Sequence, residues 1–229
     1  MKLGVISDIH GNYPAYQSVI NKFQEEGVDK IICLGDVLGY FHKSNEVIQD
    51  LINRDILTIM GNHEAYFLNI INYNSENEFI YNYESLQNSI SSVQLNWLSN
   101  LERSHIITIH GKTIGFFHGS PWDPLNEYIY PDYDNFKKFH EINCDYIFLG
   151  HTHYPMIKKV EDKTIVNPGS CGLPRNSDSR AHALIFDITK NEKFQFIRES
   201  YDVMSFTSEA FMNGVDLKAI RKIYPDYHL

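Results

Sequence analysis

Five short apolar runs of this chain each lead into a glycine-containing stretch that carries aspartate, asparagine or histidine. The side chains concerned are Asp8, His10, Asp36, Asn62, His63, His118, His151 and His153. The neighbouring glycines, at positions 11, 35, 61, 119 and 150, allow the backbone to turn sharply beside them. Ligands of α/β sheets bind outside the carboxyl ends of the strands. Polar residues that follow strands in this way are therefore expected to converge on one site.

The N-terminal part alternates predicted strands with predicted helices. Apolar runs predict strands over 3–6, 31–34 and 56–60, and helical spacing predicts helices over 12–26 and 44–54. Gly27 is expected to end the first helix, and Ser44 is expected to cap the second. Strands that alternate with helices favour parallel pairing.

The rest of the chain is predicted to be richer in strands. A stretch rich in Asn and Tyr, 69–83, is predicted to be a helix end and a loop over one edge, and helical spacing returns over 91–101. Strands are predicted over 105–110 and 113–118, joined as a hairpin, and over 146–149, 156–160, 164–166, 182–187 and 194–198. Parallel units followed by an antiparallel meander favour two sheets packed face to face with helices outside, in a single domain that spans 1–229.

Charge and composition disfavour several classes of protein. The formal net charge of -9 argues against a general nucleic-acid binder, which needs a basic surface. Cys33, Cys144 and Cys171 are odd in number and far apart, so they indicate neither a disulfide framework nor a zinc knuckle. The sequence shows no signal-peptide pattern and no apolar run of about 18 residues. The expectation is a cytoplasmic protein without membrane association, and the sequence leaves its oligomeric state open.

The ligand types indicate a pair of transition-metal ions. Carboxylates combined with imidazoles suit Mn, Fe, Zn or Ni, with Mn or Fe favoured, better than they suit calcium. Two Asp, four His and one Asn are too many for one tetrahedral ion and fit two ions that share a bridging carboxylate. With a bridging hydroxide, such a centre keeps about one positive charge, which suits an anionic phosphate ester.

The motifs resemble those of the calcineurin-like metallophosphoesterases. The matching blocks, in the order of that family, are Asp8–His10, Gly35-Asp36, Gly61–Glu64, His118 and Gly150–His153. A narrower resemblance, to small prokaryotic phosphodiesterases and diadenosine tetraphosphatase-related proteins, is carried by residues 7–12, 35–40, 118–124, 167–170 and 174–176. The resemblance implies an α/β fold of the α+β kind: a four-layer αββα sandwich of two mixed sheets flanked by helices.

The resemblance also implies a role for each motif residue. Asp8, His10 and His153 would hold the first metal. Asn62, His118 and His151 would hold the second, and Asp36 would bridge the two. His63 would be the catalytic residue, which faces the scissile phosphate, stabilises its charge and protonates the leaving oxygen. Asn62, His63 and Arg175 are the predicted substrate contacts, and Ser170 is a candidate to support the site.

One departure from the family bears on the substrate. Where its protein phosphatases carry Asp-Arg-Gly, this chain reads Gly39-Tyr40-Phe41. The arginine that would grip phosphate and the aspartate that would orient the catalytic histidine are missing from that position. The resemblance therefore predicts neither a protein phosphatase nor the symmetrical diadenosine tetraphosphatase pattern. Aromatic residues expected to line a pocket that stacks a base are Tyr40, Phe41, Tyr66, Trp122 and Tyr128.

Three classes of function fit this pattern to different degrees. The leading class is an enzyme that uses a metal-bridging hydroxide to hydrolyse phosphoester or phosphoanhydride bonds in a small nucleotide-type phosphoester or dinucleoside polyphosphate. A non-catalytic protein-binding scaffold of the same fold would be expected to lose ligands or His63, and all are present. A metal-dependent nuclease is disfavoured by the acidic charge and by the lack of an added DNA-binding domain.

Overall fold

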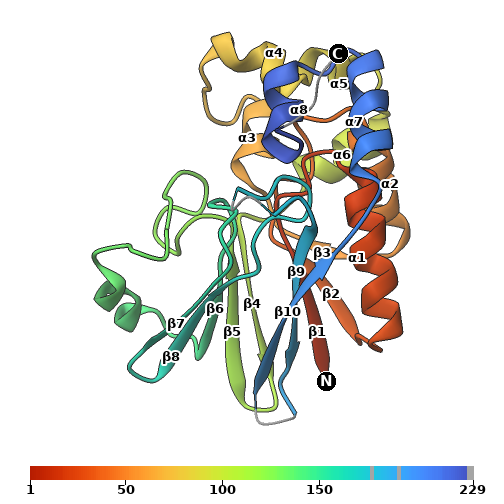
Figure 1. Ribbon diagram of the computed structural model, residues 1–229. Coiled ribbons are helices and arrows are strands. Elements are labelled where there is room, and N and C mark those ends of the chain that lie inside the picture. The colour runs from red at the N-terminus through yellow and green to blue at the C-terminus, as the bar shows by residue number, and fades with distance from the viewer. Residues whose placement is uncertain (176–177, 190–191, 226–229) are drawn as a thin grey trace.

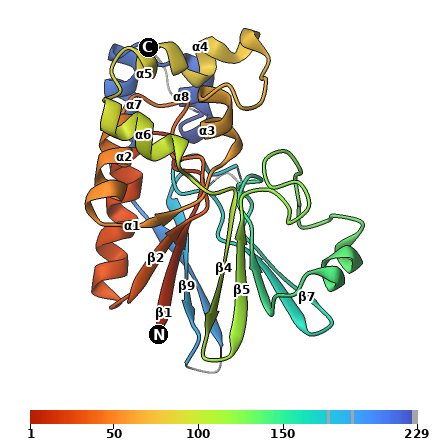
Figure 2. The same ribbon diagram turned by 180° about the vertical axis from the view of Figure 1, so that it is seen from behind.

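Two five-stranded sheets face each other in this chain (Figures 1 and 2). The computed structural model describes residues 1–175, 178–189 and 192–225, so Asn176 of the resemblance and the last four positions of the predicted domain lie outside it. The first sheet, in the order β10-β9-β1-β2-β3, contains β1 (Lys2–Ile6), β2 (Lys30–Cys33), β3 (Leu57–Thr58), β9 (Ala181–Asp187) and β10 (Lys193–Glu199). The second, in the order β4-β5-β6-β8-β7, contains β4 (Ser104–Ile109), β5 (Lys112–Phe117), β6 (Tyr146–Phe148), β7 (Met156–Val160) and β8 (Lys163–Asn167).

Both sheets are mixed, which confirms the predicted fold class. In the first sheet β1, β2 and β3 pair in parallel, and β9 and β10 pair antiparallel. In the second, β5, β6 and β8 pair in parallel between antiparallel edge strands. The antiparallel meander predicted for the second half is therefore wrong. Long connections lead from the end of one strand back to the start of the next, so that β5, β6 and β8 run parallel. The last two strands, β9 and β10, belong to the first sheet.

Three helices cover the outer face of the first sheet: α1 (Tyr13–Glu25), α2 (Ser44–Asn53) and α6 (Ser92–Ser99). The side chain of Asn12 caps α1 by accepting from the main-chain N–H of Ala15. Ser44 is the first residue of α2 rather than its cap, because its hydroxyl donates to the carbonyl of Phe41 in the preceding turn. The apolar stripes of these helices pack on Cys33 and other residues of the sheet.

The outer face of the second sheet is covered by loops and a short 3₁₀-helix. The connection from β5 to β6 includes η2 (Phe136–Glu141), whose Phe139 is fully buried and packs with Ile147 of β6 and Leu149. Between the two sheets lies a separate apolar core that includes the buried rings of Phe148 and Phe186, 5.9 Å apart. A large apolar side chain buried in this way contributes about 1.5–3 kcal/mol.

Short helices lie over the carboxyl ends of the parallel strands of the first sheet, in the upper part of Figures 1 and 2. They are α3 (Asn62–Phe67), η1 (Ser75–Asn77), α4 (Glu78–Tyr81), α5 (Tyr83–Gln87), α7 (Val203–Met212) and α8 (Leu217–Ile223). The stretch 69–83 thus holds short helices where a helix end and a loop were predicted. Of the helices in the described part of the chain, none is both long and apolar enough to cross a bilayer.

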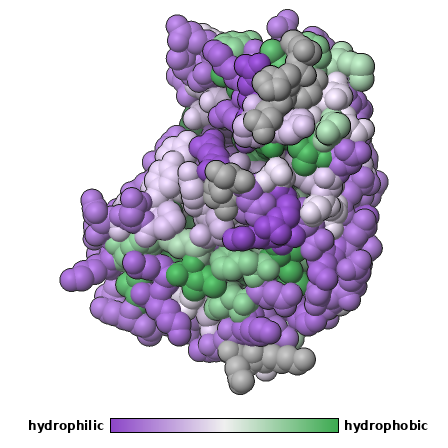
Figure 3. Space-filling model, viewed as in Figure 1, coloured by the Kyte–Doolittle hydropathy of each residue, from purple (hydrophilic) through white to green (hydrophobic). Residues whose placement is uncertain are grey.

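Apolar side chains gather over the lower part of the face shown in Figure 3, and hydrophilic ones surround them. The exposed large apolar residues of the chain include Ile157 of β7, at 40% exposure, and Phe196 of β10, at 38%. Both strands are edges of their sheets. Each sheet therefore carries an exposed apolar residue on an edge strand.

Candidate metal centre

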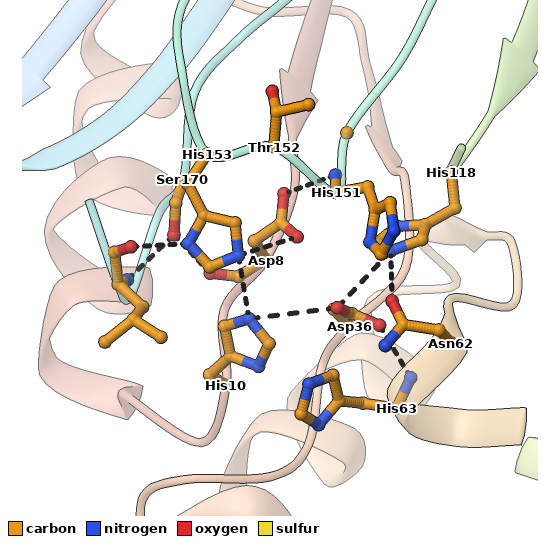
Figure 4. Close-up of polar contacts among 12 residues, drawn as sticks. Asp8, His10, Asp36, Asn62, His63, His118, His151, Thr152, His153 and Ser170 are labelled. Carbon is orange, nitrogen blue, oxygen red and sulfur yellow. Dashed lines mark hydrogen bonds and ion pairs between the residues drawn. The ribbon is translucent and has the colours of Figure 1, made fainter. Parts of the chain in front are cut away.

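The loops that follow β1, β2, β3, β5 and β6 bring the predicted ligands into one buried cluster (Figure 4). Each predicted ligand and His63 is at most 5% exposed; these residues are Asp8, His10, Asp36, Asn62, His63, His118, His151 and His153. Charged and polar groups are rarely buried together in this way unless they are paired or bind an ion. The convergence expected from the sequence is therefore present.

Three of the histidines are held in one orientation by main-chain carbonyls. The Nδ1 atom of His10 lies 3.2 Å from the oxygen of Leu38, that of His118 lies 2.8 Å from Leu34, and that of His153 lies 2.5 Å from Leu173. A carbonyl can only accept, so each Nδ1 carries a proton and donates. The Nε2 atoms are directed into the cluster, where in the neutral ring each offers a lone pair. Metal-binding histidines are oriented in the same manner.

The inward atoms form two groups of potential ligands. Asp8, His10 and His153 offer atoms that all lie within 4.8 Å of one another, and so do Asp36, His118 and His151. In the first group, His153 Nε2 lies 3.4 Å from Asp8 Oδ1. In the second, His118 Nε2 lies 3.3 Å from Asp36 Oδ2. Asn62 joins the second group through its Oδ1 atom, 3.0 Å from His118 Nε2.

Several contacts in this cluster suit divalent cations better than hydrogen bonds alone. The Nε2 atoms of His10 and His153 face each other at 3.3 Å, although neutral rings held through Nδ1 would place two lone pairs there. Asp8 Oδ1 and His151 Nε2 are buried without a hydrogen-bond partner among the residues that the structure describes. Carboxylate oxygens and imidazole nitrogens are ordinary ligands for Mn, Fe and Zn. The residues present therefore fit the implied metal ions.

Burial and mutual attraction shift the pKa values of these groups in different directions. Burial raises the pKa of Asp8 to about 7 and lowers that of His151 to about 3. Burial also opposes charge on Asp36 and His118, but their mutual attraction outweighs it. The pKa of Asp36 is held well below its usual range, and that of His118 is raised to about 9. Without metal, a proton on His118 thus balances the carboxylate, and metal binding would have to displace that proton.

The backbone is strained at five of the seven predicted ligands. Asp8 has φ 55°, His10 51°, Asp36 55°, His151 65° and His153 65°, all in the left-handed region. This conformation costs an L-residue roughly 1–2 kcal/mol and is concentrated at functional sites. Since glycine would relieve the strain, the side chains at these positions have a use that outweighs the cost in stability.

Comparison with known proteins places this geometry in a family. A sequence profile of the calcineurin-like phosphoesterase superfamily domain matches residues 1–191. The chain belongs to this superfamily. It is 31% identical over 223 residues to the uncharacterized protein MJ0912 of Methanocaldococcus jannaschii, across 88% of each chain. It is 24% identical over 179 residues to the phosphodiesterase MJ0936 of the same organism, across 75% of this chain and 84% of that one.

A solved structure shows the same fold as this phosphoesterase. A metallophosphoesterase from Sphaerobacter thermophilus has a TM-score of 0.81 at 24% identity, over 97% of this chain and 98% of that one. The match to the superfamily domain and the named relatives confirm the resemblance inferred from the motifs, together with the prediction of an enzyme of the metallophosphoesterase class. Membership of the family also implies divalent metal ions.

Glu64 organises two loops of the phosphoesterase site, a role that the motif alone did not reveal. It is fully buried, and burial raises its pKa to about 7. Its Oε2 atom accepts from the main-chain N–H groups of Asp36 and Gly61, both at 2.8 Å, and its Oε1 accepts from that of Val37 at 2.8 Å. One carboxyl group thus ties the loop after β2 to the N-terminus of α3, which fixes Asp36 beside Asn62.

Glu64→Ala should destabilise the protein by about 3 kcal/mol, because it leaves several buried N–H groups without an acceptor and each costs about 1–3 kcal/mol. Urea unfolding of the metal-free protein measures the change in the free energy of unfolding. Glu46→Ala is the matched control, since Glu46 also lies in the first turn of a helix but is exposed. It should change stability by less than about 1 kcal/mol. Equal effects of the two substitutions would contradict this account of Glu64.

A tyrosine holds the ring of His63, and sequence reasoning missed it. The hydroxyl of Tyr83 lies 2.6 Å from His63 Nδ1, and both residues are buried. The main-chain N–H of His63 donates to Asp36 Oδ1 at 2.9 Å. The rings of Tyr40 and Tyr81 also pack against the imidazole, with centroids 5.2 Å and 4.7 Å away. Tyr83 therefore orients the imidazole of His63 in a chain that lacks the aspartate of the Asp-Arg-Gly motif.

The predicted pocket aromatics divide into two sets. Tyr40 and Tyr66 pack near His63, and Tyr128, 43% exposed, stacks on His151 with centroids 3.7 Å apart. The other two pack elsewhere: Phe41 against Phe206 of α7, and Trp122 between Phe139 of η2 and the ammonium of Lys138. Phe41 and Trp122 therefore belong to apolar clusters rather than to the surroundings of the site histidines.

The loop after β8 supplies further groups to the site. The hydroxyl of Ser170 donates to the main-chain oxygen of Asp8 at 2.8 Å and accepts from the N–H of Leu173. Arg175 follows in the same loop, and its positive charge lowers the pKa of His153 after burial, the larger cause. Ser170 thus supports the turn at Asp8, and Arg175 lies within electrostatic reach of the cluster.

Proposed function

We propose that this phosphoesterase binds two divalent ions and hydrolyses small nucleotide-type phosphoesters or dinucleoside polyphosphates. The observation that carries the proposal is the position of Asp36. Its Oδ2 atom lies 3.3 Å from His118 Nε2 in one ligand group and 3.8 Å from His10 Nε2 in the other. A carboxylate that faces both groups is suited to bridge two ions.

The ligands would divide between the two ions as the family's motifs imply. Asp8, His10 and His153 would hold one ion, and Asn62, His118 and His151 the other. When bound, the ions, with Mn or Fe favoured, would act as Lewis acids on the phosphate and would supply a nucleophile derived from water. The protein holds Asp8 and Asp36 in fixed turns and shields the cluster from solvent, so little rearrangement is needed during the reaction.

His63 would act beside the scissile phosphate. Burial lowers the pKa of its imidazole to about 4, so the ring is neutral at pH 7 before substrate binds. An anionic phosphate next to the ring favours the protonated form and raises this pKa. The ring could then donate to the phosphate and transfer a proton to the leaving oxygen. The hydroxyl of Tyr83 fixes the orientation of the His63 ring through its contact with Nδ1. Arg175 would contact the anionic substrate.

Aromatic residues near the site favour a substrate that contains a nucleotide. Tyr128 is partly exposed and lies directly on His151, and Tyr66 is partly buried beside His63. Stacking of a base on such a ring is worth on the order of 1–3 kcal/mol in single-strand binders. A relative of this chain is named a phosphodiesterase, which agrees with a substrate esterified on more than one side.

Steady-state turnover of the manganese-loaded protein tests this function. We expect hydrolysis of bis(p-nitrophenyl) phosphate that a chelator abolishes and added manganese restores. We also expect a higher kcat/KM for diadenosine tetraphosphate than for a phosphoserine peptide, with the same metal and pH. A preference for the peptide would contradict the nucleotide assignment. Absence of all three activities in the metal-loaded protein would contradict the enzymatic proposal.

A further inference from the structure

A lysine of the last described helix lies at the border of the proposed active site. The ammonium nitrogen of Lys222, in α8, lies 5.2 Å from the centre of the Tyr40 ring. That ring is 4.8 Å from the imidazole of His10 and 5.2 Å from that of His63, measured between centroids. The Tyr40 ring is therefore a common neighbour of the Lys222 ammonium and of two site histidines.

Arg175 adds a second positive charge at the same border. Its Nε atom is buried and has no hydrogen-bond partner among the described residues. Its positive charge lowers the pKa of Lys222, although burial is the larger cause of that shift. Although Lys222 is exposed as a whole, the protein around its ammonium group and the neighbouring guanidinium lower its pKa. The two cations are thus close enough to repel each other.

Neither cation has an acidic partner in the part of the chain that the structure describes. Within residues 1–175, 178–189 and 192–225, neither Arg175 nor Lys222 forms an ion pair. Other basic residues do: Lys43 pairs with Glu209 at 2.7 Å, and Arg180 pairs with Asp178 at 2.8 Å. Acidic partners are plentiful in a chain of net charge -9. Two cations near the proposed active site that form no ion pair with described residues are suited to attract a further anionic group.

We propose that Lys222 and Arg175 bind a second phosphate of the substrate, next to the one that is cleaved. This inference rests on the proposed function and narrows its substrate class to molecules with a phosphoanhydride chain, such as dinucleoside polyphosphates. An isolated phosphodiester would present its only charge to the metal centre and leave Lys222 without an anion. Helix α8 lies beyond residues 1–191, which match the superfamily domain. The subsite would therefore combine the family's core with a segment outside the matched domain.

A pair of lysine variants on one helix provides the test. Lys222→Met keeps an aliphatic side chain but removes the charge, and Lys222→Arg keeps the charge. Lys218→Met is the matched control, because Lys218 lies one turn earlier in α8 with its ammonium 5.1 Å from the ring of Phe79. For each variant, kcat/KM is measured with diadenosine tetraphosphate and with bis(p-nitrophenyl) phosphate.

We expect Lys222→Met to lower kcat/KM for diadenosine tetraphosphate by about fivefold to tenfold, the effect of losing one partly exposed charge contact. The same variant should change kcat/KM for bis(p-nitrophenyl) phosphate by less than about twofold. Lys222→Arg should retain most of the activity with the tetraphosphate, and Lys218→Met should retain it all. Equal losses with both substrates, or no loss with the tetraphosphate, would overturn the second-phosphate subsite. So would turnover of the diester by a wild-type enzyme that does not hydrolyse the tetraphosphate.

A binding experiment separates this inference from the proposed catalysis. Titration of the metal-free protein with inorganic tripolyphosphate needs no turnover and no bound metal. Lys222→Met should raise the dissociation constant about fivefold, and Lys218→Met should leave it unchanged. If the wild-type enzyme turns over none of the substrates, the proposed function fails, and this titration still decides whether Lys222 binds phosphate. Identical dissociation constants for the two variants would exclude it.

Discussion

Replacing Asp36 by asparagine should reduce kcat/KM for bis(p-nitrophenyl) phosphate more than about 100-fold. The carboxylate is 1% exposed and faces ligand atoms of both groups. Loss of a partner that only orients a ligand costs about 10–100-fold in metal affinity or activity. Loss of a shared ligand charge is expected to cost more, because it acts on two cations at short range. Excess manganese should therefore restore little of the activity.

Metal analysis of the same variant tests the bridging role directly. The wild-type protein should bind two ions per chain, and Asp36→Asn should bind one or none. Asp55→Asn is a close control, because Asp55 has φ 51° against 55° for Asp36 but lies exposed after α2. The control carries the same chemical change in the same backbone conformation, so any strain effect is shared. Near-normal turnover of Asp36→Asn at saturating manganese would refute the two-metal assignment.

The sequence was sufficient to predict that the ligands converge, because the loops that carry them begin at strand ends. The predicted strand 3–6 is β1 (Lys2–Ile6), and the predicted strand 31–34 is β2 (Lys30–Cys33), so the loops that carry Asp8 and Asp36 begin where expected. Strand ends in a parallel pair meet at one edge whatever the details of packing. The position of these side chains therefore depends on where the strands end and on the order of the strands in the sheet. Both can be predicted from the apolar runs of the sequence and from their alternation with helices.

The helices that cover the site could not be predicted from the sequence in the same way. Helix α8 has seven residues, far fewer than the 12–15 that an isolated helix needs for stability in water. It is held by tertiary contacts, in which Ile220 and Phe206 pack around Phe41 and Leu173. Those contacts join segments far apart in the chain, so neither the helix nor the position of Lys222 could be inferred from periodicity.

The aromatic residues show a second limit of the same kind. Tyr83 contacts His63 through its hydroxyl, and the ring of Tyr81 packs on the His63 imidazole. Neither tyrosine belongs to a recognisable motif. Phe41 and Trp122 do lie next to motif residues, but their side chains pack into apolar clusters. Whether an aromatic side chain points toward the site or into an apolar cluster depends on its three-dimensional surroundings. Its position next to a motif residue in the sequence does not decide this.

Replacing His63 by glutamine should lower kcat by about 10²–10⁴-fold, the usual contribution of a general acid, and should leave two ions bound. The metal content decides between two roles, because His63 also offers an atom within 4.8 Å of ligand atoms of His10 and Asp36. Metal analysis and kcat are measured on the same preparation. His110→Gln, at an exposed hairpin turn, is the control and should change neither. Loss of an ion from His63→Gln would place this histidine among the ligands instead.

The second half of this prediction concerns the tyrosine behind the ring. Burial holds the pKa of Tyr83 well above its usual value, so the hydroxyl stays protonated at every working pH. Tyr83→Phe keeps the packing and removes one hydrogen bond, worth about 0.5–1.5 kcal/mol, so kcat should fall by about threefold to tenfold with KM little changed. If Tyr83 acts only through His63, the double variant should be no slower than His63→Gln alone. An additive loss in the double variant would mean that Tyr83 contributes to the site by a route independent of the imidazole.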